Sequence, residues 1–140
     1  MNHKIKIFMN HTKDDIAVIN KSNEDEMKKT KKIKSNKIYF SSKEDADCCI
    51  KDSAIYYRNE KIVDLSDIRV KGMHNYENIM CAIIATKELG ISNEEIKEVL
   101  DKFVGVEHRI EFVRRLNERE FYNDSKATNV RSTEIALNAF

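Results

Sequence analysis

The sequence predicts an α/β fold, in which short strands and amphipathic helices form layers around a shared core. Short apolar runs of strand length recur in the first half of the chain, two consecutive segments with helical spacing follow, and strand-like runs return after them. The chain has 140 residues, of which 41% are hydrophobic and 35% charged, enough for a core and a heavily charged surface. This length suits one small domain or a piece of a larger one.

The first half of the chain predicts short strands. Apolar and β-branched residues gather in runs that are bounded by polar residues. These runs are residues 16–19, 38–40, 54–57 and 61–64. The short connection 58–60 predicts that the last two runs form a hairpin. Residues 21–37 hold a group of acidic residues and then many lysines, without clear alternation, which indicates a solvated helix or loop.

The middle of the chain predicts two helices in succession. From Tyr76 onward apolar residues recur at helical spacing, and Gly90 is placed to cap the C-terminal end of this helix. Ser92 and Glu95 then form the pattern of a capping box, which predicts the start of the second helix. Gly105 is expected to end it. The apolar face predicted for the second helix comprises Ile96, Val99, Leu100 and Phe103.

The remainder of the chain changes character again. Residues 110–113 and 120–122 predict two strands, joined by the charged stretch 114–119. Residues 123–129 form a polar loop, and a helix is predicted from Ser132 to the end of the chain. Isolated helices shorter than about 12 residues are only marginally stable. We therefore expect the chain to stop within a domain.

Charge and cysteine usage exclude several classes of protein. Lys and Arg number 25 against 24 Asp and Glu, and the net charge of +1 gives no overall attraction to nucleic acid or anionic lipid. A nucleic-acid-binding arm at 21–37 is the alternative, although no aromatic residues are interleaved there. No apolar run approaches the ~20 residues that span a bilayer, and the N-terminal segment MNHKIKIF lacks the apolar region of a signal peptide. The three cysteines show neither a disulfide framework nor zinc spacing, so we expect a cytoplasmic protein with reduced thiols.

Two asparagines lie where the first predicted helix begins. Asn75 and Asn78 are three residues apart, so they can share one face of the first helical turn. A side-chain amide offers both a donor and an acceptor, which suits the edge of a purine base. The alternative is that Asn75 caps the helix, a position that asparagine favours.

A second polar pair, His108 and Arg109, lies where helical spacing gives way to strands. Arginine at such a point can stack on a base or bind phosphate oxygens with two of its nitrogens. The alternative is an ion pair of Arg109 with Glu107 or Glu111 on a solvated strand, which would contribute little energy.

The polar loop 123–129 is the third candidate, because catalytic and binding groups concentrate on loops at strand ends. Asp124 can accept hydrogen bonds from ribose hydroxyls, and Lys126 can neutralise charge on a transferring phosphoryl group. Thr128, with the amides at the start of the next helix, can bind a carboxylate or a phosphate. The alternative is an ordinary capped loop.

Three segments resemble the Mur ligases of peptidoglycan synthesis, namely GMHNYEN, GVEHRIEFV and FYNDSKATNV. The NDSKATN loop is typical of the branch that adds D-glutamate, whereas other branches carry a proline-containing loop there, and this chain has no proline. The similarity covers most of the chain and is weakest over residues 21–70. It implies that residues 1–106 are the second half of a central ATP-binding domain, with a P-loop-type sheet and flanking helices. Residues 107–140 would be the linker and the truncated start of a Rossmann-like C-terminal domain.

The resemblance implies an ATP-dependent ligase that forms an amide bond and uses Mg²⁺. ATP would phosphorylate the carboxylate of UDP-N-acetylmuramoyl-L-alanine, and the amine of D-glutamate would attack the acyl phosphate. By motif position, Asn75 and Asn78 would approach the adenine. His108, Arg109 and Asp124 would lie near the ribose and the phosphates.

The resemblance also implies roles closer to the reaction. Lys126 would face the reacting phosphoryl group, and Thr128 the incoming D-glutamate. The segment HKIKIF resembles a family stretch, A-K-x-R-I-[YF], whose lysine is carbamylated and helps to position magnesium, so Lys4 would be the modified residue. Carbon dioxide adds only to a neutral amine, and an ordinary lysine has a pKa of about 10.4, so the site would have to desolvate the amine. The carbamate then supplies oxygens for a hard cation.

The chain lacks one part that the resemblance requires. Its only glycines are Gly72, Gly90 and Gly105, so no glycine-rich phosphate loop can be written in it. Without the amides and the lysine of such a loop little holds the β- and γ-phosphates, and we expect the chain to be inactive alone. Half of a parallel sheet also leaves an unpaired edge, which predicts marginal stability or self-association. The alternative from a different class is a stand-alone nucleotide-binding or interaction module without ligase activity.

Overall fold

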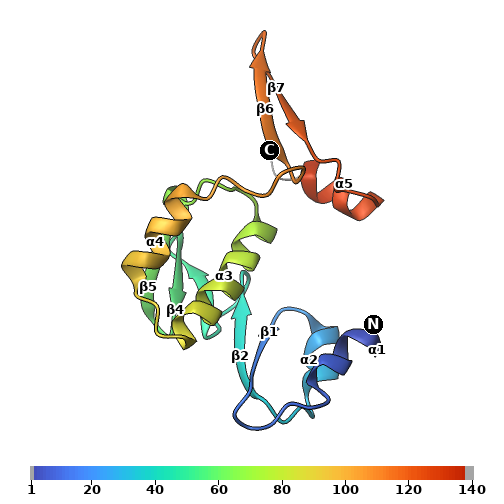
Figure 1. Cartoon of the computed structure of the whole chain (residues 1–140), viewed down its shortest axis with the longest axis vertical. Coiled ribbons are helices and arrows are strands. Elements are labelled where there is room, and N and C mark those ends of the chain that lie inside the picture. The colour runs from blue at the N-terminus through green and yellow to red at the C-terminus, as the bar shows by residue number, and fades with distance from the viewer. Residues whose placement is uncertain (1, 138–140) are drawn as a thin grey trace.

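A five-stranded sheet forms the centre of the structure, a computed structural model that describes residues 2–137 (Figure 1). Neighbours in the sheet are also neighbours in sequence, in the order β1-β2-β3-β4-β5. The strands are β1 (Ile16–Asn20), β2 (Asn36–Ser41), β3 (Cys48–Lys51), β4 (Ala54–Tyr57) and β5 (Glu60–Asp64). The pairings β1–β2 and β2–β3 are parallel, whereas β3–β4 and β4–β5 are antiparallel. The predicted α/β class is confirmed.

All the strands predicted in the first half of the chain form, and the structure adds β3. Cys48 and Cys49 are buried in this strand, which pairs with β2 on one side and β4 on the other. Sequence periodicity gives no signal for so short a strand, because its conformation comes from these two pairings. The predicted hairpin is confirmed as well. Its turn is made by Arg58 and Asn59, with φ of 47° and 66°, which matches the right-handed twist of the flanking strands.

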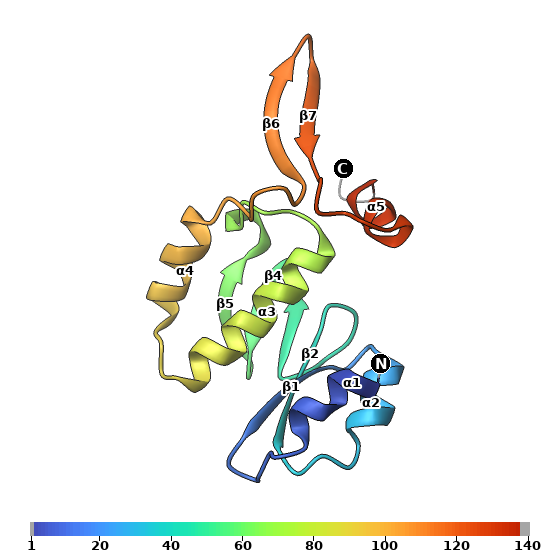
Figure 2. The same ribbon diagram turned by 45° about the vertical axis from the view of Figure 1, so that its right-hand side comes forward.

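Helix α3 (Met73–Glu88) lies across one face of the sheet, and α4 (Asn93–Lys102) lies beside β5 (Figures 1 and 2). The side chains that α3 buries recur at helical spacing and contact the sheet in one core cluster. They are Ile79, Met80, Ile83 and Ile84, and they join Ile55 and Ile62 of the sheet. This packing fixes α3, and with it the polar residues of its first turns.

Helix α3 begins earlier than the sequence predicts. Gly72 is its N-cap, with φ of 102° and ψ of 140°, a conformation that only glycine adopts without strain. Asn75 therefore lies inside the first turn, and the alternative that Asn75 caps the helix is wrong. At the other end Gly90, with φ of 83°, follows the C-cap residue Leu89, which confirms the predicted end.

The capping box at the start of α4 is confirmed. Ser92 Oγ accepts a hydrogen bond from the Glu95 N–H at 3.3 Å, and the Glu95 carboxylate accepts one from the Ser92 N–H at 3.0 Å. The prediction that Gly105 ends this helix is wrong. The helix ends at Lys102, because Phe103 already has an extended backbone with ψ of 110°.

The N-terminal part of the chain adds short helices around β1 and β2. These are α1 (Asn2–Ile5), a 3₁₀ turn at Lys6–Phe8 and α2 (Glu24–Thr30); a further 3₁₀ turn, Leu65–Asp67, follows β5. Residues 21–37 are predicted to be a solvated helix or loop, and α2 shows that part of them is a helix. Two of its lysines pair with acidic residues one turn earlier, at 3.1 and 3.4 Å. These exposed pairs offset part of the positive charge of this segment.

The strands β6 (Glu111–Leu116) and β7 (Arg119–Asn123) form a separate antiparallel hairpin that extends away from the main sheet (Figure 1). Both predicted strands are confirmed, but the charged stretch expected to connect them is mostly strand. The turn consists of Asn117 and Glu118 alone, with φ of 48° and 61°. A two-residue turn with both φ values positive is the usual geometry of a tight hairpin.

Helix α5 (Val130–Leu137) confirms the last predicted helix but starts before Ser132. Asn129 caps it, since its Oδ1 accepts a hydrogen bond from the Ser132 N–H at 3.0 Å. Residues 138–140 of the predicted helix lie outside the described residues. No helix within residues 2–137 is long and apolar enough to cross a membrane.

Candidate functional site

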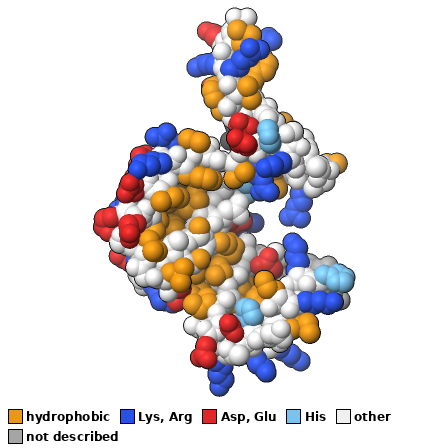
Figure 3. All heavy atoms as spheres, viewed as in Figure 1, with side chains coloured by type: hydrophobic (Ala, Val, Ile, Leu, Met, Phe, Trp, Pro, Cys, Tyr) orange, Lys and Arg blue, Asp and Glu red, His pale blue; other side chains and the backbone are white. Residues whose placement is uncertain are grey.

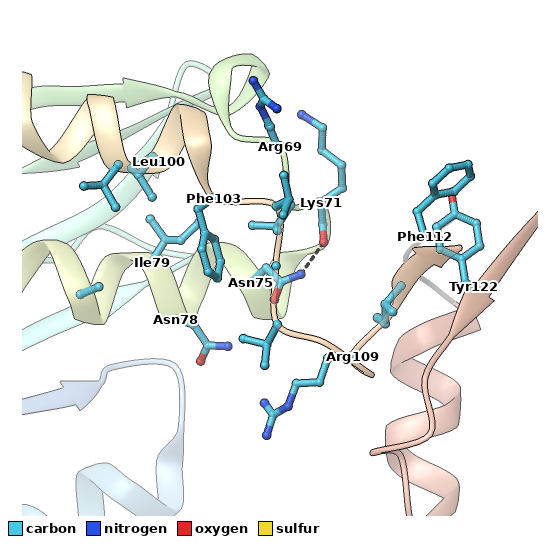
Figure 4. Close-up of a pocket in the computed structure, with 17 residues that line it drawn as sticks. Arg69, Lys71, Asn75, Asn78, Ile79, Leu100, Phe103, Arg109, Phe112 and Tyr122 are labelled. Atoms are coloured by element: carbon cyan, nitrogen blue, oxygen red, sulfur yellow. Dashed lines mark hydrogen bonds between the residues drawn. The ribbon is translucent and has the colours of Figure 1, made fainter. Parts of the chain in front are cut away.

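A pocket of about 540 Å³ lies where α3, the C-terminal end of α4 and the segments on either side of them meet (Figure 4). This volume is in the range of small-molecule sites, roughly 300–1,000 Å³. Its wall is mainly apolar and is formed by Val70, Ile79, Leu100, Phe103, Val104 and Val106. Its polar lining residues include Lys71, Asn75, Asn78 and Arg109. A mainly apolar cavity with a few polar groups is the usual composition of a ligand site.

The apolar wall is the part of the site that the sequence analysis misses. Ile96 and Leu100 of the predicted α4 face are buried, but Val99 is 65% exposed and Phe103 40% exposed. Both of these exposed residues line the pocket instead of the core. The signal in the sequence is the apolar run that continues past the end of the helix to residue 106.

Gly105 lets this wall approach the segment before α3. Its φ is 107°, and a Cβ atom at this position would lie 3.3 Å from Cγ1 of Val70. A side chain here would be strained and crowded. Because Gly105 has no side chain, the segment after α4 can lie close to Val70 in the segment before α3.

Asn75 and Asn78 both line the pocket, which agrees with the prediction that their spacing lets them share one face of the helix. The Asn75 Nδ2 donates a hydrogen bond to the carbonyl oxygen of Lys71 at 2.7 Å. Asn78 is exposed, and its side chain makes no hydrogen bond within the described part of the chain. The pocket thus contains one amide with a fixed orientation and one that is free to rotate.

Arg109 also lines the pocket, and its side chain extends towards the part of the cavity that Asn78 faces (Figure 4). The alternative of an ion pair with Glu107 or Glu111 is wrong, since Arg109 forms no ion pair among residues 2–137. Glu111 instead accepts a hydrogen bond from the His108 N–H at 2.8 Å and lies 3.6 Å from His108 Nδ1. The guanidinium of Arg109 therefore keeps its donors for a ligand.

The polar loop 123–129 is bound to the turn that carries His108 and Arg109. Asp124 Oδ1 accepts a hydrogen bond from the Ile110 N–H at 3.2 Å, and the Lys126 N–H donates to the His108 carbonyl at 3.1 Å. Asn123 Nδ2 and His108 Nδ1 lie 2.8 Å apart. The second and third polar clusters of the sequence are thus one structural unit.

Five predicted site residues do not line the pocket: His108 and Asp124, which belong to the unit that carries Arg109, and three exposed residues. Lys126 and Thr128 are exposed on the loop, and Lys4 is exposed on α1. Among residues 2–137 no group of three or more His, Cys, Asp or Glu side chains is arranged to hold a metal ion. Figure 3 shows a notch between the N-terminal and C-terminal parts of this face, with Lys and Arg side chains on both sides of it.

Cys48 and Cys81 are not candidates for nucleophilic chemistry. Burial raises the pKa of the Cys48 thiol to about 12 and that of Cys81 to about 11. The reactive form of cysteine is the thiolate, so these thiols are almost entirely unreactive at neutral pH.

The fold and the pocket together define an α/β domain with a cavity of small-molecule size where α3 meets the segment that leads to the hairpin. Residues 1–86 match the model of the Mur ligase middle domain. The chain belongs to the Mur ligase family, as three of its segments predict.

Curated relatives are similar over nearly the whole chain. UDP-N-acetylmuramoylalanine--D-glutamate ligases of Bacillus cereus are 48% identical in strain G9842 and 49% identical in strain B4264, and that of Bacillus thuringiensis strain Al Hakam is 48% identical. Each match covers 98% of this chain and 31% of the relative. The chain therefore spans about a third of the length of these relatives.

Solved structures share the fold at low sequence identity. MurF from Acinetobacter baumannii has a TM-score of 0.81 and 17% identity, covering 99% of this chain and 32% of that protein. The UDP-N-acetylmuramoylalanyl-D-glutamyl-2,6-diaminopimelate--D-alanyl-D-alanyl ligase of the same organism has a TM-score of 0.78. The shared architecture extends over the main sheet, the helices and the hairpin.

Proposed function

We propose that this chain forms the base- and ribose-binding side of the ATP site in a ligase that adds D-glutamate to UDP-N-acetylmuramoyl-L-alanine. In this reaction ATP supplies the phosphoryl group that activates the carboxylate of the nucleotide-linked substrate, and the amine of D-glutamate then displaces phosphate. The observation that carries the proposal is that Asn75, Asn78 and Arg109 line one pocket with apolar walls. The names of the relatives support the choice of D-glutamate.

The pocket suits a purine base. A planar heterocycle has two apolar faces and a polar edge, and such a ligand is bound by apolar contacts together with a few directed hydrogen bonds. Phe103 and Val104 provide apolar surface on the side of α4, and Ile79 provides it on α3. The amides of Asn75 and Asn78 are then available to the edge of the base.

His108, Arg109 and Asp124 serve the ribose and the phosphates in this proposal. One oxygen of Asp124 accepts from the Ile110 N–H, and the other remains for a ribose hydroxyl. The Arg109 guanidinium can stack on the base or bind phosphate oxygens with two nitrogens. His108 contacts the loop that carries Asp124 through its backbone carbonyl and its Nδ1 atom. In this proposal His108 thereby keeps Asp124 close to Arg109.

In this proposal Lys126 and Thr128 act where the phosphoryl group is transferred and where D-glutamate binds. The Lys126 backbone is held by His108, whereas its ammonium is exposed and can reach a transferring phosphoryl group. Thr128 lies on the same loop, next to the start of α5, where it can contact the carboxylates of D-glutamate.

A role for Lys4 in binding magnesium depends on its carbamylation. The carbamate would supply oxygens that a hard cation prefers. Lys4 is exposed on α1, so the environment that desolvates its amine and the remaining metal ligands would come from residues outside 2–137.

We assign residues 1–106 to the second half of the central ATP-binding domain, and residues 107–140 to the linker and the start of the C-terminal domain. The main sheet with its helices ends at Lys102, and the hairpin β6–β7 forms a second sheet. The 140 residues contain only three glycines and no phosphate loop. Other protein residues would then bind the β- and γ-phosphates, and the chain alone would not turn over. We place the protein in the cytoplasm, in agreement with its free cysteines.

A chimeric ligase tests this proposal. These 140 residues replace the matching segment of the Bacillus cereus strain G9842 ligase, and phosphate release is measured with ATP, UDP-N-acetylmuramoyl-L-alanine and D-glutamate. We expect turnover that requires D-glutamate, is not supported by D-alanine, and is lost on Lys126→Ala. The matched control is Lys97→Ala, an exposed lysine of α4 outside the pocket, which should retain turnover. A folded chimera that binds ATP without turnover would instead support a nucleotide-binding module.

A further inference from the structure

We propose that Asn123 holds the imidazole of His108 in the tautomer with its proton on Nε2, so that His108 presents a hydrogen-bond donor to an oxygen of the bound nucleotide. The inference rests on the proposed nucleotide site and adds two positioning residues to it, Asn123 and Glu111. Neither of these residues contacts the ligand in this account, because both act through the ring of His108.

The amide of Asn123 has one orientation that satisfies its neighbours. Its Oδ1 accepts a hydrogen bond from the Ser125 N–H at 3.1 Å, and a backbone N–H can only donate. Its Nδ2 donates to Oε2 of Glu111 at 3.4 Å, and an ionised carboxylate can only accept. A flipped amide would place oxygen against oxygen and N–H against N–H, so it would lose both contacts. The NH₂ group of Asn123 is therefore the end that faces His108.

This orientation determines which ring nitrogen of His108 carries the proton. Asn123 Nδ2 lies 2.8 Å from His108 Nδ1. Because an amide nitrogen can only donate, Nδ1 must accept, and an imidazole nitrogen accepts only when it carries no proton. In the neutral ring the proton is then on Nε2. Nε2 has no hydrogen-bond partner within the described residues 2–137, and His108 is exposed, so this N–H is available to a ligand.

The backbone of His108 is held as well, which fixes the point from which the ring extends. The His108 N–H donates to Glu111 at 2.8 Å, and the His108 carbonyl accepts from the Lys126 N–H at 3.1 Å. The next residue, Arg109, lines the pocket. An N–H donor beside this guanidinium suits a ligand oxygen that accepts, whether in a phosphate or in the ribose, and does not suit a group that can only donate.

Two substitutions that together leave the net charge unchanged test the tautomer. Glu111→Gln keeps a side-chain oxygen that can accept from Asn123 and from the His108 N–H. Asn123→Asp, added to Glu111→Gln, keeps an acceptor for the Ser125 N–H but turns a second acceptor towards His108 Nδ1. The double variant therefore reverses the partner of Nδ1, while the turn at Ser125 is preserved.

Proton–nitrogen correlation NMR spectra of the imidazole, recorded at about pH 8, show which nitrogen is protonated. We expect the proton of His108 on Nε2 in the unaltered chain and in Glu111→Gln, and a proton on Nδ1 in the double variant. His11 is the internal control: its Nδ1 lies 2.7 Å from Oγ of Ser35, a hydroxyl that can donate or accept, and its signals should not change. A proton on Nδ1 of His108 in the unaltered chain, or an unchanged ring in the double variant, would overturn the inference.

Titrations with ATP and with adenosine, followed by NMR, identify the oxygen that accepts. The double variant should bind ATP about tenfold more weakly than the unaltered chain, which has the same net charge. A loss with ATP alone assigns the acceptor to a phosphate, and an equal loss with adenosine assigns it to the ribose. Equal affinities of the two chains for both ligands would overturn the donor role and leave the proposed ATP site standing. A folded unaltered chain that binds neither ligand would contradict the proposed function, whereas the imidazole spectra would still decide the tautomer.

Discussion

The carboxylate of Asp124 accepts a hydrogen bond from the Ile110 N–H at 3.2 Å, across 14 residues of sequence. This contact joins the loop after the hairpin to the turn before it, next to the residue that extends into the pocket, Arg109. Two polar motifs that are separate in the sequence are thereby held as one unit on the edge of the pocket.

Removing this carboxylate should loosen the unit. We expect Asp124→Ala to destabilise the turn by about 1 kcal/mol, because the Ile110 N–H loses its acceptor. Amide hydrogen exchange at Ile110 should become faster. Asp124→Asn is the control, since its oxygen can still accept, and it should keep most of the protection. Unchanged exchange in Asp124→Ala would show that the contact does not order the turn.

The packing of α3 on the sheet should dominate the stability of the chain. Ile83 is 1% exposed and lies in the main core cluster, so Ile83→Ala should reduce the free energy of unfolding by about 2–5 kcal/mol. Leu89, at the end of the same helix, is 81% exposed. Leu89→Ala should therefore change the free energy of unfolding by less than about 0.5 kcal/mol. Urea unfolding followed by circular dichroism measures both. Similar effects of the two substitutions would contradict the described packing.

The capping box of α4 should make stability depend on pH. Hydrogen bonds from the side chain and the backbone of Ser92 lower the pKa of Glu95 from its ordinary value of 4.5. A carboxylate with a lowered pKa in the folded state stabilises fully above its unfolded pKa, and this contribution is lost as pH falls through the folded pKa. The difference in stability between the unaltered chain and Glu95→Ala should therefore shrink between about pH 6 and pH 3. A difference that stays constant over this range would argue against the box.

The hairpin turn offers a stabilising substitution. Glu118 has φ of 61°, which costs energy for a residue with a Cβ atom and little for glycine. Glu118→Gly would create the Asn-Gly pair favoured in such turns and should raise the free energy of unfolding of the hairpin by about 0.5–1 kcal/mol. Glu118→Ala keeps the Cβ atom and should give no gain. Backbone amide hydrogen exchange in β6 and β7 measures the stability of the hairpin. If Glu118→Ala stabilised it as much as Glu118→Gly, backbone strain at Glu118 would not be the cause.

Local signals in the sequence predict most of the elements of this fold. The β-branched run at 16–19 and the Ser92–Glu95 box each specify an element through neighbouring residues, and both are present. β3 is not predicted, because its strand conformation depends on its pairing with β2 and β4. The start of α3 is misplaced, because Asn75 has the residue type of a cap but Gly72 has the backbone that the position needs.

The sequence predicts part of the polar lining of the pocket but not its apolar walls. The spacing of Asn75 and Asn78 on a helix places both in the pocket. The apolar side of the pocket depends on how α4 ends, and the apolar run that continues to residue 106 does not by itself show whether Phe103 packs in the core or lines a pocket. The hydrogen bond between Asn75 and the Lys71 carbonyl could not be predicted either, because every residue has a backbone carbonyl and the sequence does not show which one accepts.

A calorimetric titration of the 140-residue chain with ATP and magnesium tests the central claim most directly, with Asn78→Ala and Arg109→Ala as variants. Only the base and ribose side of the site lies in this chain in our proposal, so we expect weak binding, with Kd on the order of 1 mM. Each variant should abolish this binding while its circular dichroism spectrum remains unchanged. Binding that survives in both variants, or its absence from the folded unaltered chain, would contradict the assignment of this pocket to the nucleotide.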